Sequence, residues 1–330
     1  MRVGLLLLTA ALAWQATATI AASAPAQGAW TDSSILIGGL RRWYRIYRPA
    51  HLPKGAATVV LLHGGTQSMR KIFNSRAGGT RAWLEIADRH GVLLLVPNGV
   101  NPATGDTAGD RQHWNDLRPS GSDRHADADD VRFITALVDQ VGKTQGTDPR
   151  RVYLTGASNG GMMTYRLLIE APGRFAAAAT FIAALPLDSA LLSPPKRPTP
   201  LLIANGTEDP LVRWEGGRTA GRPGLLRGAE ATLDWWIRAN RADRKHPVQR
   251  SLSDTDPRDG CRLLVTTYRA LPGGAPVQFV TMAGGGHAMP SREHRLPDTR
   301  LVRRLIGPVC RDAEGADMAW DFLSKFPGPL

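Results

Sequence analysis

The sequence predicts one α/β domain with a mostly parallel central sheet and helices on both faces of that sheet. Short apolar segments rich in Val, Leu and Ile alternate along the chain with segments of helical periodicity. Strands that alternate with helices are joined by crossover connections, which produce parallel strand pairs. With 330 residues, 42% of them hydrophobic, the chain is long enough to bury a sizeable core.

The expected elements follow one another without an internal repeat or a visible linker. An opening hairpin is expected at 35–37 and 41–48, where the residues from Trp43 onward alternate as on a strand with two distinct faces. Asp129 caps a helix that runs to about residue 141, and Gly91 ends an earlier one. Further strands are expected at 57–62, 92–96, 152–155, 176–182, 201–204, 263–268 and 277–281, and further helices at 81–90, 159–169 and 230–239, with two short helices closing the chain.

The N-terminus is typical of an export signal. Arg2 supplies a positive start, residues 4–14 are apolar, and Ala22-Ser23-Ala24 offers small residues for cleavage. The apolar run is shorter than the roughly 20 residues that a membrane-spanning helix needs. We therefore expect a signal peptide over 1–24, a catalytic domain over 25–330, a periplasmic or secreted location, and no stable membrane insertion.

Cys261 and Cys310 are the two cysteines of the chain. In an oxidising compartment an even pair suggests one disulfide, which would close a loop worth about 3–4 kcal/mol of stability. Two buried free thiols are the alternative.

The segment Gly156-Ala157-Ser158-Asn159-Gly160 follows an apolar, β-branched run and precedes a helix-forming stretch. This strand–turn–helix pattern is that of a nucleophile elbow, in which a serine hydroxyl is lifted above the carboxyl end of the sheet. Because a serine hydroxyl is a weak nucleophile, it needs a neighbouring base. Ser158 is therefore the candidate nucleophile.

Two more strand ends carry residues suited to that chemistry. Asp209 follows the strand at 201–204, and His287 follows the strand at 277–281 after three glycines. The order Ser158, Asp209, His287 is that of a hydrolase triad in which His287 is the base and Asp209 orients it. Glu208 and Asp254 are the alternatives to Asp209. His63 is expected to make structural hydrogen bonds, and the histidines show no metal-ligand spacing, so no metal site is expected.

The oxyanion of such a reaction needs backbone donors. The N–H of Asn159, directly after the nucleophile, is one candidate, and the N–H of Thr66 in His63-Gly64-Gly65-Thr66 is the other. Gly64 and Gly65 would let that loop approach a substrate closely.

The chain resembles the secreted polyhydroxybutyrate-depolymerase-like and feruloyl-esterase-like branch of the α/β-hydrolases. The resemblance implies the α/β-hydrolase fold, hydrolysis of carboxylic esters by the triad of Ser158, Asp209 and His287, and no cofactor. It covers the chain from about residue 35 to the C-terminus and rests on the segments at 62–68, 114–116, 129–134, 148–153, 156–163, 206–212, 215–217 and 284–290.

Two positions depart from the family pattern. Asn205 stands where the family often has His, and Met289 stands where it often has a Trp that lines the cleft. Substrate choice is therefore expected to differ here. Trp114 and Trp214 are candidates for lining the cleft, with loop packing as the alternative for each, and the loops 100–128, 183–199 and 213–228 are expected to set specificity.

The formal net charge of +12 favours anionic partners, although a generally basic surface is the simpler interpretation. No nucleic-acid-binding motif is present, so nucleic acid is not an expected partner. The family also includes hydrolases of poly(aspartic acid), and Arg213, Arg218 and Arg222 could steer such an anionic polymer. An exported ester hydrolase acting on hydroxybutyrate-type oligomers or feruloyl-type esters remains the first hypothesis. The amide-cleaving hydrolase of an anionic polymer is the second, and a non-catalytic binding protein is the third.

Overall fold

The computed structural model describes residues 28–73, 79–116, 118, 128–187, 193–219 and 224–328. The segment 1–24, predicted to be a signal peptide, lies outside these residues. Parts of the three loops expected to set specificity, including Arg222, also lie outside them.

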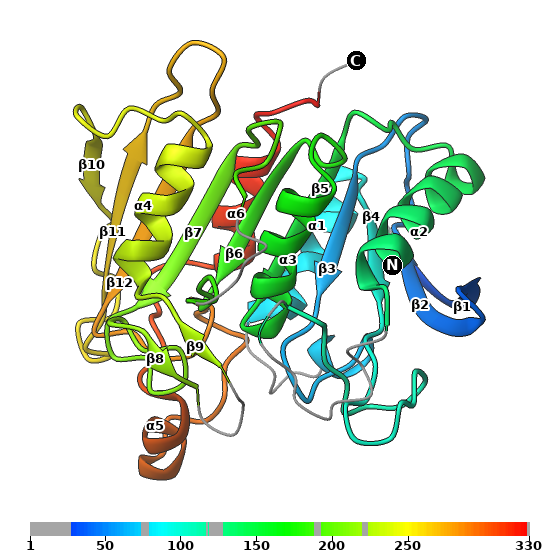
Figure 1. Ribbon diagram of the computed structural model, residues 1–330. Helices are drawn as coiled ribbons and strands as arrows, with labels where there is room; N and C mark the ends of the chain where they lie inside the picture. The colour runs from blue at the N-terminus through cyan, green and yellow to red at the C-terminus, as the bar shows by residue number, and fades with distance from the viewer. Residues whose placement is uncertain are drawn as a thin grey trace, which may run out of the picture.

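Ten strands of the described residues form one sheet in the order β1-β2-β4-β3-β5-β6-β7-β12-β11-β10 (Figure 1). Its centre is parallel, because β4, β3, β5, β6, β7 and β12 each pair in parallel with their neighbours in this group. Antiparallel strands flank it on both sides. The strands are β1 (Ala29–Ile37), β2 (Leu40–Arg48), β3 (Thr58–Leu62), β4 (Leu93–Pro97), β5 (Val152–Ala157), β6 (Ala177–Phe181), β7 (Leu201–Gly206), β10 (Val248–Ser251), β11 (Arg262–Tyr268) and β12 (Val277–Ala283), with β8 (Gly217–Arg218) and β9 (Leu225–Leu226) in a separate pair.

Helices cover both faces of the sheet (Figure 1). On one face, α2 (Asp130–Gln145), α3 (Asn159–Glu170) and α4 (Ala229–Ala239) enclose one apolar core. On the other face, α1 (Ala82–His90) and α6 (Gly315–Leu323) enclose a second core. The remaining short helices are η1 (Lys71–Phe73), η2 (Gly79–Arg81) and α5 (Arg300–Ile306).

The central strands are continuous apolar runs because helices bury them on both faces. Every residue of β3, β4, β6 and β7 is buried, whereas β2 alternates over much of its length. The predicted helix ends are confirmed: the Asp129 carboxylate accepts the Arg132 N–H at 2.9 Å, and Gly91 ends α1 with φ 62°. The predicted fold class is confirmed as well.

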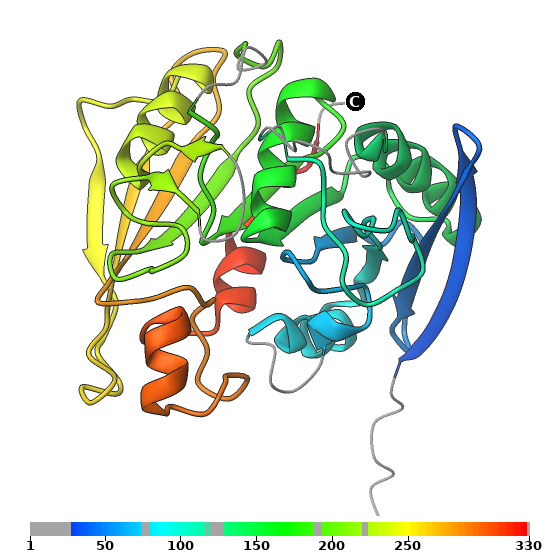
Figure 2. The same ribbon diagram turned by 60° about the horizontal axis from the view of Figure 1, so that its bottom comes forward.

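The carboxyl ends of the parallel strands lie at the bottom of Figure 1 and come forward in Figure 2. The turn from β5 to α3 and the short helix α5 both lie at this end. Ligands of open α/β sheets bind beyond the carboxyl ends of the strands, so this end is where a site is expected. Within the described part of the chain, no helix is long and apolar enough to cross a membrane.

Candidate active site

Ser158 occupies a sharp turn between β5 and α3. Its backbone has φ 56° and ψ −124°, a left-handed conformation that is uncommon for a residue with a side chain. The turn brings the start of α3 against the end of β3, because a Cβ atom at Gly160 would lie 2.2 Å from the carbonyl oxygen of Leu62. Only glycine fits there, so the Gly-x-Ser-x-Gly pattern has a direct steric cause.

The structure brings Ser158, His287 and Asp209 into one hydrogen-bonded chain. The Ser158 Oγ lies 3.0 Å from His287 Nε2, and His287 Nδ1 lies 2.7 Å from Asp209 Oδ2. These contacts fit a neutral imidazole that donates from Nδ1 to the carboxylate and accepts the serine proton at Nε2. Along the chain, Ser158 lies 129 residues and Asp209 lies 78 residues before His287, so the fold brings them together.

Asp209 is fixed by the turn that follows β7. Its side chain is fully buried, and its Oδ1 accepts the N–H groups of Leu211 and Val212, each at 2.8 Å. The other oxygen is thereby left to face His287. Glu208 is exposed and Asp254 pairs with Arg262 at 2.6 Å, so neither alternative occupies this place.

The two predicted oxyanion donors have different outcomes. Asn159 is the first residue of α3, where an N–H has no acceptor within the helix. The N–H of Thr66 donates to the carbonyl of Gln112 at 2.9 Å, because residues 67 and 112 pair as an antiparallel bridge. The prediction of Thr66 as an oxyanion donor is therefore wrong.

Trp114 does not line a cleft, so its predicted role in substrate binding is also wrong. Its side chain is 0% exposed, and its indole N–H donates to the carbonyl of His63 at 2.9 Å. The ring lies 4.7 Å from that of His63. His63 makes structural hydrogen bonds as predicted: Nδ1 donates to the Gly64 carbonyl at 2.8 Å and Nε2 accepts the Gly99 N–H at 3.0 Å. Burial lowers the pKa of His63 to about 4, so it stays neutral.

A buried polar network that the sequence analysis missed lies behind the elbow. The Asn159 side chain bonds the N–H and carbonyl of Trp114 at 2.8 and 3.0 Å and reaches Asp116 Oδ2 at 2.6 Å. Asp116 in turn forms a buried ion pair with Arg118 at 2.6 Å. The Trp114-Asn115-Asp116 motif was a signal for this network, but only Trp114 was assigned a role from it, that of a cleft residue.

The other substrate-binding candidates lie on the segment that follows Asp209. Trp214 is partly buried, with its ring 5.8 Å from that of Phe279, whereas Arg213 and Arg218 are exposed. Their roles remain predictions.

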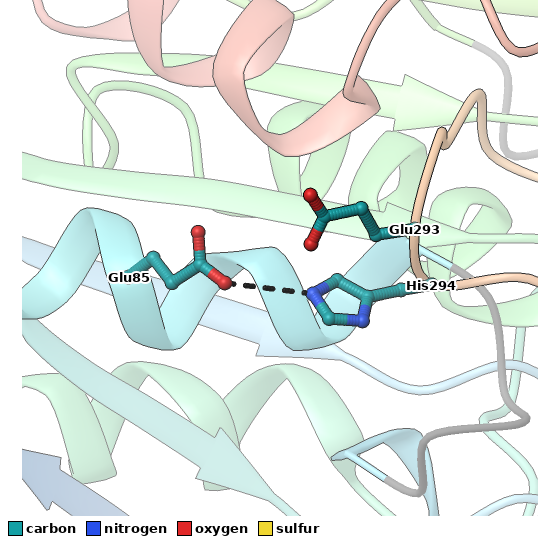
Figure 3. A group of neighbouring side chains, drawn as sticks. All are labelled: Glu85, Glu293 and His294. Atoms are coloured by element: carbon teal, nitrogen blue, oxygen red, sulfur yellow. Dashed lines mark ion pairs between the residues drawn. The ribbon is translucent and has the colours of Figure 1, made fainter.

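One group of possible metal ligands occurs among the described residues. Glu85 on α1 and Glu293 and His294 on the loop after β12 have ligand atoms within 4.8 Å of one another (Figure 3). The two carboxylates are exposed, and His294 forms an ion pair with Glu85 at 3.6 Å. Exposed groups of this kind are common without an ion, so this group alone assigns no metal.

Cys261 and Cys310 are joined by a disulfide, as predicted from the even pair of cysteines.

The mostly parallel sheet covered by helices on both faces, together with the serine on the turn between β5 and α3, defines a serine hydrolase of the α/β-hydrolase class. A solved acetyl xylan esterase from Aspergillus awamori superposes with a TM-score of 0.53 at 16% identity, covering 79% of this chain and 95% of that one. The prolyl oligopeptidase family, a group of this class, matches residues 94–186.

The relatives of similar sequence indicate which kind of α/β-hydrolase this chain is. The putative esterase NocK of Nocardia uniformis subsp. tsuyamanensis is 31% identical over 89% of this chain and 82% of its own length. Feruloyl esterase B of Piromyces equi is 28% identical over 62% of this chain, and poly(3-hydroxybutyrate) depolymerase of Ralstonia pickettii is 29% identical over 46%. The chain spans only 32% and 30% of the length of these two proteins. The chain belongs to the esterase branch of the α/β-hydrolases, and it is a serine carboxylic ester hydrolase.

Proposed function

We propose that this protein hydrolyses esters through an acyl-enzyme on Ser158. His287 takes the serine proton during attack and passes it to the leaving alcohol, and a water activated by the same imidazole then releases the acid. Asp209 holds the tautomer and stabilises the imidazolium. The observation that carries the proposal is the contact of Ser158 Oγ with His287 Nε2 at 3.0 Å, on an elbow that holds the serine in a strained backbone.

We assign the oxyanion to the N–H groups of Asn159 and Gly65. Gly65 immediately precedes the misassigned Thr66, and a Cβ built on it would lie 3.7 Å from Cβ of Asn159. The backbones of Gly65 and Asn159 are therefore neighbours, which supports the assignment. Removal of one such donor typically costs about 10²–10³ in rate.

A small cavity adjoins the elbow at Gly156 and Ala157, and Ser158 is not among its lining residues; we propose that this cavity receives a short acyl group. It holds ≈ 30 Å³ and is lined by Gly64, Ala157, Thr80 and Met289 among others. A Cβ at Gly64 would lie 3.7 Å from Cβ of Ser158, and Met289 is buried with its sulfur 3.9 Å from the Thr80 hydroxyl. Such a space holds a group of only a few heavy atoms. As the acyl site, it would favour acetyl or short hydroxyacyl esters over bulky feruloyl ones.

The test is a substrate panel of p-nitrophenyl acetate, butyrate and octanoate, methyl ferulate and hydroxybutyrate oligomers, with Ser158→Ala as the inactive control. We expect the highest kcat/KM on acetate and short hydroxyacyl esters. Met289→Ala should widen the cavity and shift the preference toward longer chains. Met318→Ala, on α6 beside the same core, is the matched control and should leave the preference unchanged. Equal rates on ferulate and acetate would contradict the assignment.

An anionic polymer is the second candidate substrate, favoured by exposed Arg213 and Arg218 within ten residues of Asp209 and by the net charge of +12.

We also propose that the protein is exported. The predicted signal at 1–24 and the Cys261–Cys310 disulfide support this, because disulfides persist in oxidising compartments.

A further inference from the structure

The backbone around His287 is held by one neighbouring segment. The N–H of Gly286 donates to the carbonyl of Pro308 at 2.7 Å, and the N–H of His287 donates to the carbonyl of Ile306. Further along, the N–H of Ser291 donates to the carbonyl of Cys310 at 2.9 Å. The segment 306–310 is thus the hydrogen-bonding partner of the loop that carries the proposed base.

The stretch that leads into the segment 306–310 has few buried side chains to hold it in place. Between residues 292 and 309, Gly307 alone is buried, and α5 contributes no buried side chain. The anchor is at the end of the segment, where Cys310 is 2% exposed and bonded to Cys261, the residue directly before β11. A Cβ at Gly285 would lie 2.8 Å from the Cys310 sulfur, so the bridge packs directly against the His287 loop.

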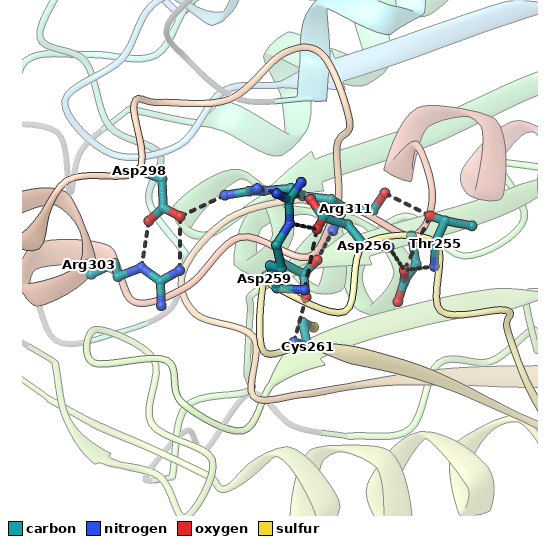
Figure 4. Close-up of polar contacts among 9 residues, drawn as sticks. Thr255, Asp256, Asp259, Cys261, Asp298, Arg303 and Arg311 are labelled. Carbon is teal, nitrogen blue, oxygen red and sulfur yellow. Dashed lines mark hydrogen bonds and ion pairs between the residues drawn. The ribbon is translucent and has the colours of Figure 1, made fainter.

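Polar groups reinforce the bridge on both sides (Figure 4). The carboxylate of Asp259, 1% exposed, accepts the N–H of Cys261 and the N–H of Arg311, each at 2.6 Å. The Arg311 guanidinium then pairs with Asp256 at 3.0 Å and with Asp298 at 2.7 Å. These contacts tie Arg311 to the loop before β11, and they tie Asp298, at the start of the segment 298–311, to Arg311 at its end.

We propose that the Cys261–Cys310 disulfide, with Asp259 behind it, is a positioning element for His287, so that the catalytic rate depends on the oxidation state of this bridge. The inference rests on the proposed function, because it assumes that His287 is the base. The bridge does not touch the substrate. It fixes the segment whose carbonyls hold the backbone of residues 286 and 287. Reduction by a dithiol would break the S–S bond, deliver two electrons and two protons to the sulfurs, and oxidise the reagent to its cyclic disulfide.

The test compares Cys261→Ala/Cys310→Ala with wild type at a temperature well below unfolding. We expect kcat on p-nitrophenyl acetate to fall about 10- to 100-fold, because a displacement of about 1 Å at a reacting group can cost about 100-fold. KM should change little. The rate of Ser158 labelling by a fluorophosphonate should fall by the same factor as kcat, since labelling also needs the base.

Val265→Ala is the matched control. It removes buried volume from β11, four residues from Cys261, without touching the bridge. It should lower Tm yet keep wild-type kcat. Asp259→Asn keeps the disulfide but loses one of two acceptor oxygens, and we expect a severalfold lower kcat at unchanged KM.

A folded double variant with wild-type kcat, or one whose loss matches only its unfolded fraction, would overturn the proposal. Should the double variant not fold, Asp259→Asn decides: a lower kcat at constant KM supports the proposal and an unchanged kcat overturns it. Failure of the proposed function is separate, because it would show as wild-type activity in Ser158→Ala.

Discussion

The side chain of Asn159 bonds both backbone groups of Trp114, accepting its N–H at 2.8 Å and donating to its carbonyl at 3.0 Å. The residue after the nucleophile thus serves two purposes. Its own N–H is the proposed oxyanion donor, while its buried amide fixes the loop behind the elbow.

Asn159→Ala separates these two purposes. It leaves the backbone N–H in place but removes the partner of the buried N–H and carbonyl of Trp114, each of which costs about 1–3 kcal/mol when left unsatisfied. We expect the free energy of unfolding, measured in urea, to fall by about 3 kcal/mol, with kcat reduced far less than in Ser158→Ala. Asn205→Ala is the control. Asn205 is equally buried, and among the described residues its side chain makes one hydrogen bond, to the carbonyl of Ala183, so about 1 kcal/mol should be lost.

Asp209→Asn tests the orienting carboxylate. An amide there can meet the His287 Nδ1–H only if it gives up an acceptor to Leu211 and Val212, and it favours the wrong tautomer. We expect kcat to fall about 10⁴-fold with little change in KM. Glu208→Gln, at the exposed neighbouring position, should stay within a few-fold of wild type. Comparable losses in both variants would contradict the assignment.

His63 makes stability depend on pH. Burial lowers its pKa from the usual 6.5 to about 4 in the folded state. Between these values the unfolded chain binds a proton that the folded chain does not, so stability falls as the pH falls from 6.5 to 4. The shift corresponds to about 3 kcal/mol. The free energy of unfolding, measured in urea at pH 7 and at pH 4, should lose this difference between the two pH values in His63→Gln. The variant of the exposed His51, His51→Gln, should keep the difference.

Steering of an anionic substrate would depend on salt. If Arg213 and Arg218 guide a polyanion, its turnover should fall steeply between 20 and 500 mM NaCl, which shortens the Debye length about fivefold, while turnover of p-nitrophenyl acetate is unaffected. Arg213→Gln/Arg218→Gln should flatten the salt dependence. Arg89→Gln, which removes the exposed ion pair with Asp317, should not. A salt dependence that is identical in both variants would exclude these arginines as the steering groups.

Local signals predicted most of the fold and the members of the proposed triad. The central strands are long apolar runs and the elbow has a steric requirement at Gly160, so both are visible in the sequence. The strand β10 was missed because its residues Val248–Ser251 are all exposed and show no alternation of burial.

The errors at the site come from pairings between distant segments. The N–H of Thr66 is taken by the carbonyl of Gln112, and Trp114 is held in the interior by Asn159 and His63. Neither partner is near in the sequence, so the loop motifs alone predicted the wrong roles. A loop motif shows which residue types are present, but it does not show whether a given side chain contacts a substrate or packs in the core. The bracing of the His287 loop by Cys310 likewise depends on a contact across the fold.

The most direct test of the account is the site and rate of labelling by a fluorophosphonate, followed by peptide mass spectrometry. We predict one adduct per chain, on Ser158, forming rapidly in wild type and at least about 10³-fold more slowly in His287→Ala, since the serine then lacks its base. An adduct on another residue, or equal labelling of Ser158 with and without His287, would contradict it.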